Sequence, residues 1–416
     1  MIDVLKNRIE EKIGSTIKTR GDCELLSNAI TETLDIDISY NTLRRMYGLV
    51  PYTKPNTKTL NTLSQFVGYK NYADFSQNQE YKEKIDLSQL TYKAVYVNNR
   101  QAILELIKKT KNSNENFISF IVVLTRELIH NKNYRLLDEI FKLKALNFFD
   151  FPYSDALYLG NSIGLLLRQK PEIPDLLFKN TNFVRCIYLT FVDYSFLNGY
   201  YGEWTKVIVN SKPKLEVKIF SSLLLEFRNF LNQKPVKEIK LNLSTVSKLH
   251  PILSSRLVSN KFLISSPVNT IKVLDDYFKI HTQKSTRIDH CYELFTTAIL
   301  TKNLILMEYL IKEINLSNKA ENYYQKYHLN SFYLMNLFYF KLTKNNKMQK
   351  KYNGLFSVDA CVDSYEDFII ILHQIYLFGA AKTHNNKEVS KKKYTQLSAQ
   401  LNYAFFSEDF LQEYFD

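Results

Sequence analysis

The sequence predicts an all-α protein made of a small N-terminal helical bundle, residues 1–78, and a long α-solenoid of paired helices, residues 79–416. Three observations support this prediction. Apolar residues recur at the three- and four-residue spacing of amphipathic helices. The 416 residues include only 10 Gly and 9 Pro, which is few for a strand-rich chain with many turns. From about residue 85 no alternating strand pattern occurs, and short polar breaks separate helical segments.

The N-terminal bundle begins with apolar residues at helical spacing, which predict a first helix ending at Gly14. Asp22 is the expected N-cap of the second helix. Ser39 is the expected N-cap of the third, whose inner face holds Leu43, Met46 and Tyr47. After a loop with two prolines, a further short helix runs to Gly68. The outward positions of the third helix are therefore open to a partner.

Charge is unevenly distributed in this bundle. Residues 9–37 hold seven acidic and three basic residues, whereas residues 38–73 hold five basic residues and no acidic one. One face of an otherwise neutral module is therefore expected to be positive. The whole chain carries a formal charge of +13, which favours polyanionic partners through counterion release or simply reflects a solvated lysine-rich surface.

Residues 1–78 resemble the Cro/C1-type (XRE-like) helix-turn-helix family. The matching features are the run ISYNTLRRM at residues 38–46, the run KPNTKTLNTLSQFVG at residues 54–68, and the Asp74–Phe75 ending. The resemblance implies that the helix after Ser39 is the recognition helix and that the next helix completes the domain. Two features depart from the family. The segment TETLDIDIS is longer than the usual turn and lacks glycine, and Tyr47 replaces a common acidic residue.

The recognition-helix prediction names specific contacts with double-stranded DNA. Asn suits adenine, and Arg suits guanine or phosphate, when they lie at the N-terminal end of such a helix. The candidate DNA-binding residues are Tyr40, Asn41, Thr42, Arg44, Arg45, Lys54 and Lys58. Two alternatives remain open at this point: a solvated helix face, and a surface that docks protein rather than DNA.

The remainder of the chain has short polar breaks 30 to 43 residues apart, an interval typical of paired-helix repeats. The breaks lie near Asn99, Lys132, Gln169, Gly199, Gln233, Ser266, Lys302, Asn345 and Asn385. This stretch resembles a degenerate tetratricopeptide-like solenoid, with Leu, Ile, Phe and Tyr where small residues are usual. Such arrays present a curved groove that binds peptides, partner proteins or a second copy of the chain.

No motif in the sequence indicates catalysis, a cofactor or a metal site, so a non-enzymatic protein is expected. The four cysteines lie far apart, which is consistent with a reducing cytoplasm. The longest uncharged apolar run, Phe368–Ala381, is too short to span a membrane. Two lysine clusters form a candidate basic patch or, alternatively, solvated loops. They comprise Lys341, Lys344, Lys347, Lys350 and Lys351, then Lys391, Lys392 and Lys393.

These observations lead to two functional hypotheses. The first is a cytoplasmic DNA-binding regulator whose solenoid mediates dimerisation and senses a peptide or protein, the layout of peptide-responsive bacterial regulators. The second is an interaction scaffold or adaptor, in a stress or phage-defence setting, whose N-terminal module docks protein. An RNA-binding repeat protein is a third reading, which rests on charge and aromatic content alone.

Overall fold

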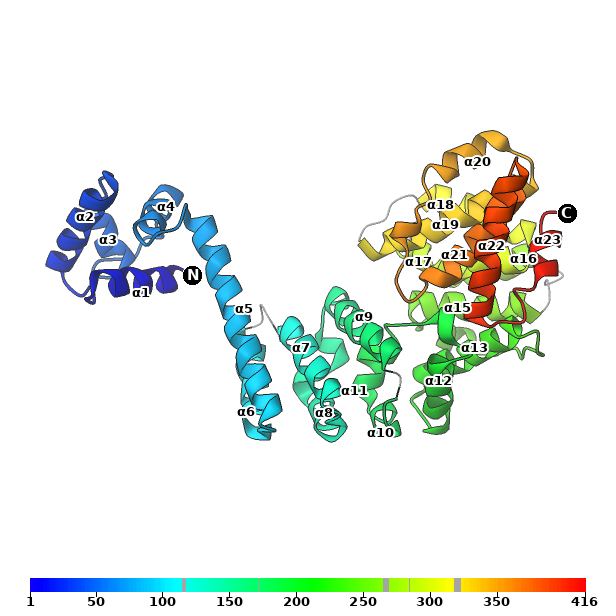
Figure 1. The fold of residues 1–416 in the computed structure, drawn as a ribbon, viewed down its shortest axis with the longest axis horizontal. Helices are drawn as coiled ribbons and strands as arrows, with labels where there is room; N and C mark the ends of the chain where they lie inside the picture. Colours follow the sequence, from blue (N-terminus) through cyan, green and yellow to red (C-terminus); the bar gives the residue numbers. More distant parts are fainter. Residues whose placement is uncertain (114–116, 171, 265–268, 284, 318–322) are drawn as a thin grey trace. The chain divides into compact units, whose positions relative to one another are not determined.

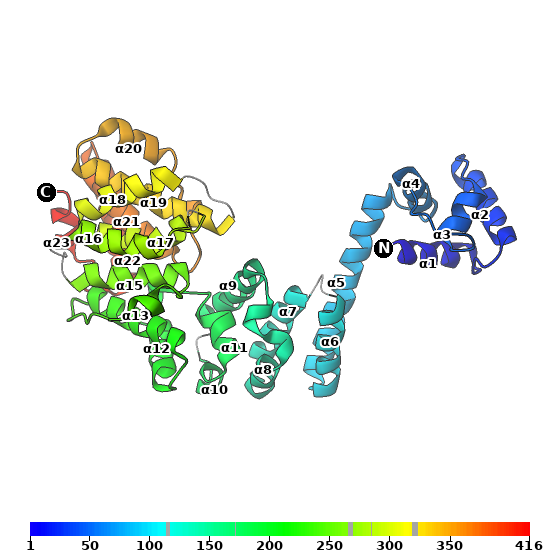
Figure 2. The same cartoon turned by 180° about the vertical axis from the view of Figure 1, so that it is seen from behind.

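The computed structural model describes residues 1–416 except 114–116, 171, 265–268, 284 and 318–322. The described residues form an all-α fold without a β-strand, which confirms the predicted fold class. The chain divides into two compact units, Met1–Leu124 and Thr125–Asp416. Figures 1 and 2 show the helices from opposite sides. The predicted boundary at residue 78 lies within one continuous helix, and no described helix has the length and apolarity to cross a membrane.

The first unit is built around one small core. Its helices are α1 (Ile2–Ile13), α2 (Arg20–Leu34), α3 (Tyr40–Met46), α4 (Thr57–Phe66), α5 (Tyr72–Tyr96) and α6 (Arg100–Ser113); α7 (Phe117–His130) contains the division between the units. Leu5 and Ile9 of α1, Leu43 of α3, Leu63 of α4 and Phe75 of α5 are all fully buried in one cluster. The five helices α1 to α5 therefore share a core, as the apolar spacing predicts.

The ends of α2 and α3 differ in part from the sequence expectation. Thr19, not Asp22, is the N-cap of α2, and Asp22 completes a capping box by accepting from the Thr19 backbone N–H at 2.8 Å. Ser39 caps α3, as predicted. The long loop between these helices needs no glycine because Asp35 adopts the left-handed conformation, with φ 54°. The Ser27 hydroxyl ties this loop to α2 by donating to the Ile38 carbonyl at 2.6 Å.

The second unit contains the remaining helices. They are α8 (Tyr134–Phe141), α9 (Tyr153–Gln169), α10 (Asp175–Phe178), α11 (Thr181–Phe183), α12 (Tyr200–Asn210), α13 (Leu215–Leu231), α14 (Leu243–Val246), α15 (Pro251–Ile264), α16 (Thr270–Ile280), α17 (Arg287–Leu300), α18 (Leu304–Ser317), α19 (Tyr323–Leu342), α20 (Asn346–Asn353), α21 (Glu366–Ala380), α22 (His384–Leu401) and α23 (Glu408–Glu413). Helices α12, α13, α15, α17 and α19 pack in sequence order, each against the next, and α21 packs against α22. This serial packing is the arrangement expected of a helical-repeat protein.

Several helix pairs are joined by the same turn, in which a non-glycine residue takes the left-handed conformation. The next residue is an asparagine whose side chain caps the following helix. The pairs are Asn98-Asn99, Lys132-Asn133, Lys302-Asn303 and Lys344-Asn345, with φ between 50° and 56° at the first residue of each. In each turn the asparagine N–H also bonds to a carbonyl five residues earlier. A chain poor in glycine can thus end one helix and start the next within three residues.

These turns confirm the predicted breaks near Asn99, Lys132, Lys302 and Asn345. A left-handed residue also marks the predicted break at Gln233. The α9 helix ends at Gln169 and α12 begins after Gly199, as expected. The break predicted near Asn385 is displaced, because Thr383 caps α22 and Asn385 lies inside that helix. The break at Ser266 lies outside the described residues.

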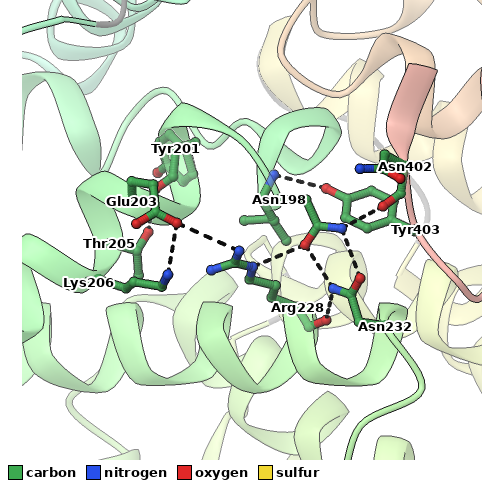
Figure 3. Close-up of polar contacts among 10 residues, drawn as sticks. Asn198, Tyr201, Glu203, Thr205, Lys206, Arg228, Asn232, Asn402 and Tyr403 are labelled. Carbon is green, nitrogen blue, oxygen red and sulfur yellow. Dashed lines mark hydrogen bonds and ion pairs between the residues drawn. The ribbon is translucent and has the colours of Figure 1, made fainter. Parts of the chain in front are cut away.

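A polar network fixes the C-terminal segment against the middle of the second unit (Figure 3). Asn198 and Asn232 exchange a reciprocal pair of amide hydrogen bonds, each 2.8 Å long. Asn198 also donates to the Asn402 carbonyl at 2.6 Å and accepts from Arg228 Nε at 3.1 Å. The Tyr403 hydroxyl accepts from the Leu197 N–H at 2.9 Å. Residues 402–403 are therefore held by the segment between η4 (Tyr194–Phe196) and α12.

Two histidines inside the second unit make its stability dependent on pH. The rings of His281 and His290 are buried and lie against each other at a tilt of 30°, with centroids 4.1 Å apart. Burial lowers the pKa of both, to about 3 for His290. In the unfolded chain both histidines have a normal pKa near 6.5. Between that pKa and the lower folded-state pKa, the histidines bind protons in the unfolded chain but not in the folded protein. The free energy of unfolding therefore decreases as pH falls below about 6.5. The contribution of His290 to this decrease is about 2 kcal/mol at pH 5.

We expect His290→Asn to reduce this pH sensitivity, because an amide does not titrate. Urea unfolding of the wild type and the variant at pH 7 and pH 5 measures the effect. Burial raises the pKa of Asp193 to about 6, which acts in the opposite direction, but its contribution is common to both proteins and cancels in their difference. Equal loss of stability by both proteins between pH 7 and pH 5 would contradict the role of His290.

Candidate functional site

The outer face of α3 carries most of the residues predicted to contact DNA. Its inner side is fixed by Leu43 and Met46, which are fully buried. Asn41 and Arg45 are exposed, whereas Tyr40, Thr42 and Arg44 are half-buried. Within the first unit the five positions thus form one accessible strip along α3, as their helical spacing predicts.

Neighbouring contacts hold this strip in place. Arg44 Nη1 donates to Asn41 Oδ1 at 3.2 Å, which orients both side chains. Arg20, at the start of α2, lies over the Tyr40 ring with its Cζ 5.1 Å from the ring centroid. It also forms an ion pair with Glu24 at 2.7 Å. Arg20 therefore places a third guanidinium beside the N-terminal end of α3.

Sequence reasoning did not select Arg20. The signal that could have found it is the capping box, because Thr19 and Asp22 fix where α2 begins and so where Arg20 projects. Lys18, immediately before the cap, is exposed as well. The start of α2 and the face of α3 together make the candidate nucleic-acid interface.

Lys54 and Lys58 are exposed but are not part of the α3 strip. Lys58 lies in the first turn of α4. Lys54 lies in the loop before α4, where it helps to line a surface hollow with Met1, Asp3 and Lys6 of the α1 end. A contact of Lys54 with DNA would therefore involve a different part of the first unit from the α3 residues.

The eight lysines of the candidate basic patch lie at the end of α19, in the turn that follows it, on α20 and on α22 of the second unit. Six of them are exposed, while Lys341 and Lys391 are half-buried. Lys391 pairs with Glu408 at 2.5 Å, and Lys351 lies over the Tyr352 ring at 5.2 Å. The ion pair to Glu408 was not foreseen and removes one positive charge from the α22 cluster.

The second unit also encloses a cavity of about 320 Å³. Helices α9, α13, α15, α17 and α19 contribute to its wall, together with the segments around residues 185–194 and 361–365. Its aromatic lining residues are Phe148, Phe149, Tyr153, Phe191, Tyr194, Phe220, Tyr292, Tyr324, Tyr327 and Tyr365. The volume and the mostly apolar wall with a few polar groups are typical of small-molecule sites.

A buried ion pair lies in the cavity wall. Arg256 Nη2 donates to Glu293 Oε1 at 2.6 Å, and both side chains are about nine-tenths buried or more. The Tyr194 hydroxyl donates to both Glu293 oxygens at 2.8 Å. Within the described residues Arg256 Nε and Nη1 make no hydrogen bond. Both carboxylate oxygens thus accept hydrogen bonds, whereas the guanidinium retains unused donors.

A second polar group of the wall is His328, whose Nδ1 lies 2.7 Å from Asp289 Oδ1. Its ring packs against the Tyr292 ring at a tilt of 31°, with centroids 4.0 Å apart. His250 stacks on Tyr153 at 5.7 Å. Desolvation by the surrounding protein lowers the pKa of His250, although the residue as a whole is exposed. These contacts hold aromatic and imidazole rings in defined positions in the cavity wall.

None of the cavity residues was predicted as a site from the sequence. They come from positions 148 to 365, and the seven histidines look dispersed along the chain. The only available signal was the high aromatic content, which is equally typical of a packed core. Within the described part of the chain, no three His, Cys, Asp or Glu side chains meet in a way that could hold a metal ion.

Comparison of the chain with protein-family models, with curated proteins and with solved structures finds no match. The resemblances to XRE-like and tetratricopeptide-like proteins therefore remain predictions from the residues quoted above.

Proposed function

We propose that the protein is a non-enzymatic DNA-binding regulator. The supporting observation is the strip on α3, where Asn41 and Arg45 are exposed and Arg44 is oriented by Asn41. Asparagine and arginine at the start of a helix are the side chains that read adenine and guanine edges. Arg20 supports the proposal because a third guanidinium, at the start of α2, suits a phosphate contact.

In this proposal the helical-repeat part is the sensing and dimerising element. The cavity of the second unit, with aromatic walls and a buried ion pair, gives such an element a place for a ligand. Regulators with helix-turn-helix domains commonly bind as dimers to paired half-sites, so a homodimer is part of the proposal.

Replacing Arg44 and Arg45 together by alanine is expected to weaken duplex DNA binding by about tenfold or more, because each arginine contact contributes about 1–3 kcal/mol. The salt dependence of binding should fall by about one unit of slope per lost phosphate contact. Duplexes enriched from a random pool by the wild-type protein, measured by fluorescence anisotropy at several salt concentrations, provide the test.

The matched control is Lys82→Ala with Lys93→Ala, which removes the same charge from exposed positions of α5. Equal weakening by both double variants would show that net charge, not the α3 strip, drives binding. If no duplex is enriched and the protein co-purifies with another protein, the scaffold hypothesis replaces the regulator.

A further inference from the structure

Two arginines line the cavity of the second unit, and one of them, Arg256, has buried donors without a protein acceptor among the described residues. Arg185 lines the cavity, is half-buried, and stacks on Phe149 with its Cζ 4.4 Å from the ring centroid. It forms no ion pair with any acidic side chain in the described residues. Arg256 lines the same cavity, is only 5 % exposed, and has Nε and Nη1 without acceptors.

An unsatisfied buried guanidinium is costly, because a charged donor removed from water loses its hydration without replacement. The rings of Phe220 and Tyr194 flank Arg256, with centroids 4.7 and 5.5 Å from its Cζ. Those rings compensate only in part, since cation–π contacts contribute less than a charged hydrogen bond. Arg256 Nε and Nη1 are themselves buried, whereas Arg185 is only half-buried and is the more accessible of the two arginines.

The other charges of the wall limit what the acceptor is. Glu216, Glu293 and Asp363 also line the cavity, and Glu293 is already paired with Arg256 and Tyr194. A dianionic group such as a phosphate would be repelled by these carboxylates. A single negative charge next to Arg185 meets less repulsion. The aromatic walls at the same time favour an apolar body of limited size.

We infer that this cavity binds a small monocarboxylate with an apolar or aromatic body. Arg185, the more accessible arginine, is the first partner of the carboxylate, Arg256 supplies further positive charge from the same wall, and the body lies between the Tyr and Phe side chains. The carboxylate comes either from a free organic acid or from the C-terminus of a short peptide. Only the regulatory role of the ligand rests on the proposed function. Ligand binding itself can be measured without DNA.

The test is calorimetry on the full chain with matched probes. We expect 4-phenylbutanoate to bind at least about tenfold more tightly than its uncharged amide, 4-phenylbutanamide, because the amide cannot make charged hydrogen bonds to arginine. Phenyl phosphate tests whether the cavity prefers a dianionic group, and 4-phenylbutylamine tests whether it prefers a cationic one. N-acetyl-Phe-Leu with a free and with an amidated C-terminus separates a peptide source from a free acid.

The inference fails if no carboxylate probe binds up to millimolar concentration. It also fails if acid and amide bind equally, or if the phosphate or the amine binds more tightly than the carboxylates. These comparisons use the wild-type chain alone, so they do not depend on how any variant folds. Carboxylate binding without DNA binding would leave this inference standing while overturning the proposed regulator.

Two variants locate the site. Arg185→Gln should weaken 4-phenylbutanoate binding about tenfold and leave the amide unchanged, because only the acid uses the lost charge. Arg126→Gln is the control, an exposed arginine of α7 that does not line the cavity. The double variant Arg256→Met with Glu293→Gln removes the buried pair together and should also lose the preference for acid over amide. Unchanged preference in both cavity variants would overturn the assignment to this cavity.

Discussion

Glu293→Gln is expected to destabilise the second unit by about 3 kcal/mol. The substitution leaves the Arg256 guanidinium charged and about 95 % buried, without its counter-charge 2.6 Å away. Removing one partner of a buried ion pair is costly because the other charge has already lost its hydration. Urea unfolding of the full chain at pH 7, followed by circular dichroism, measures the loss.

Adding Arg256→Met to Glu293→Gln is expected to restore the stability to within about 1 kcal/mol of the wild type. A buried pair replaced as a whole by uncharged side chains of similar size no longer bears the desolvation cost. Glu216→Gln is the matched control, since Glu216 is a half-buried acid of the same cavity. Its effect should lie within about 0.5 kcal/mol. Equal destabilisation by the single and double variants would show that Glu293 acts through packing.

Gly160→Ala is expected to destabilise the second unit by about 3 kcal/mol or more, because α9 there has no room for a methyl group. A Cβ at Gly160 would lie 1.7 Å from Thr190 Oγ1 and 2.6 Å from the Cys186 carbonyl oxygen. The carbonyl belongs to the π-helical turn Val184–Tyr188, whose backbone cannot move independently. Differential scanning calorimetry of the variant and the wild type measures the effect as a lower melting temperature of the variant.

The control is Gly354→Ala at the end of α20, where the nearest atom to a new Cβ is an ordinary 3.5 Å away. This change should be nearly neutral. Combining Gly160→Ala with Thr190→Ala tests the mechanism further. The hydroxyl clash is then removed, but the clashes with the Cys186 carbonyl oxygen and with the Cβ of residue 190, both at 2.6 Å, remain, so stability should recover only in part. Full recovery would show that the Thr190 hydroxyl alone causes the loss, and that the close approach of the Cys186 carbonyl and of the Cβ of residue 190 does not.

Local patterns predicted the helical part of the fold well. The spacing of Leu5, Ile9 and Leu43 identified core positions because helical periodicity is set within a few residues. The outward strip on α3 followed from the same periodicity, once Ser39 marked the start of the helix. The cap of α2 was misassigned, since Thr19 and Asp22 both suit that position and only the geometry of the box separates them.

Long-range contacts could not be predicted in the same way. The cavity joins Arg185, Arg256 and Glu293, and no local spacing reports that such distant residues share a wall. The turn with an asparagine cap was visible in the sequence as repeated Lys-Asn or Asn-Asn pairs. It was overlooked because glycine is the usual helix-ending residue in the left-handed conformation.

The polar network that holds residues 402–403 has a consequence for biosynthesis. The Tyr403 hydroxyl donates to the carbonyl of Tyr194, a cavity residue 209 positions earlier, at 2.5 Å. Contacts so far apart in sequence form late, because the intervening chain must first lose its freedom. While Tyr403 has not yet emerged from the ribosome, the nascent chain therefore lacks the hydrogen bond from Tyr403 to Tyr194 in the cavity wall. We expect the finished pocket to arise only after translation has passed that codon.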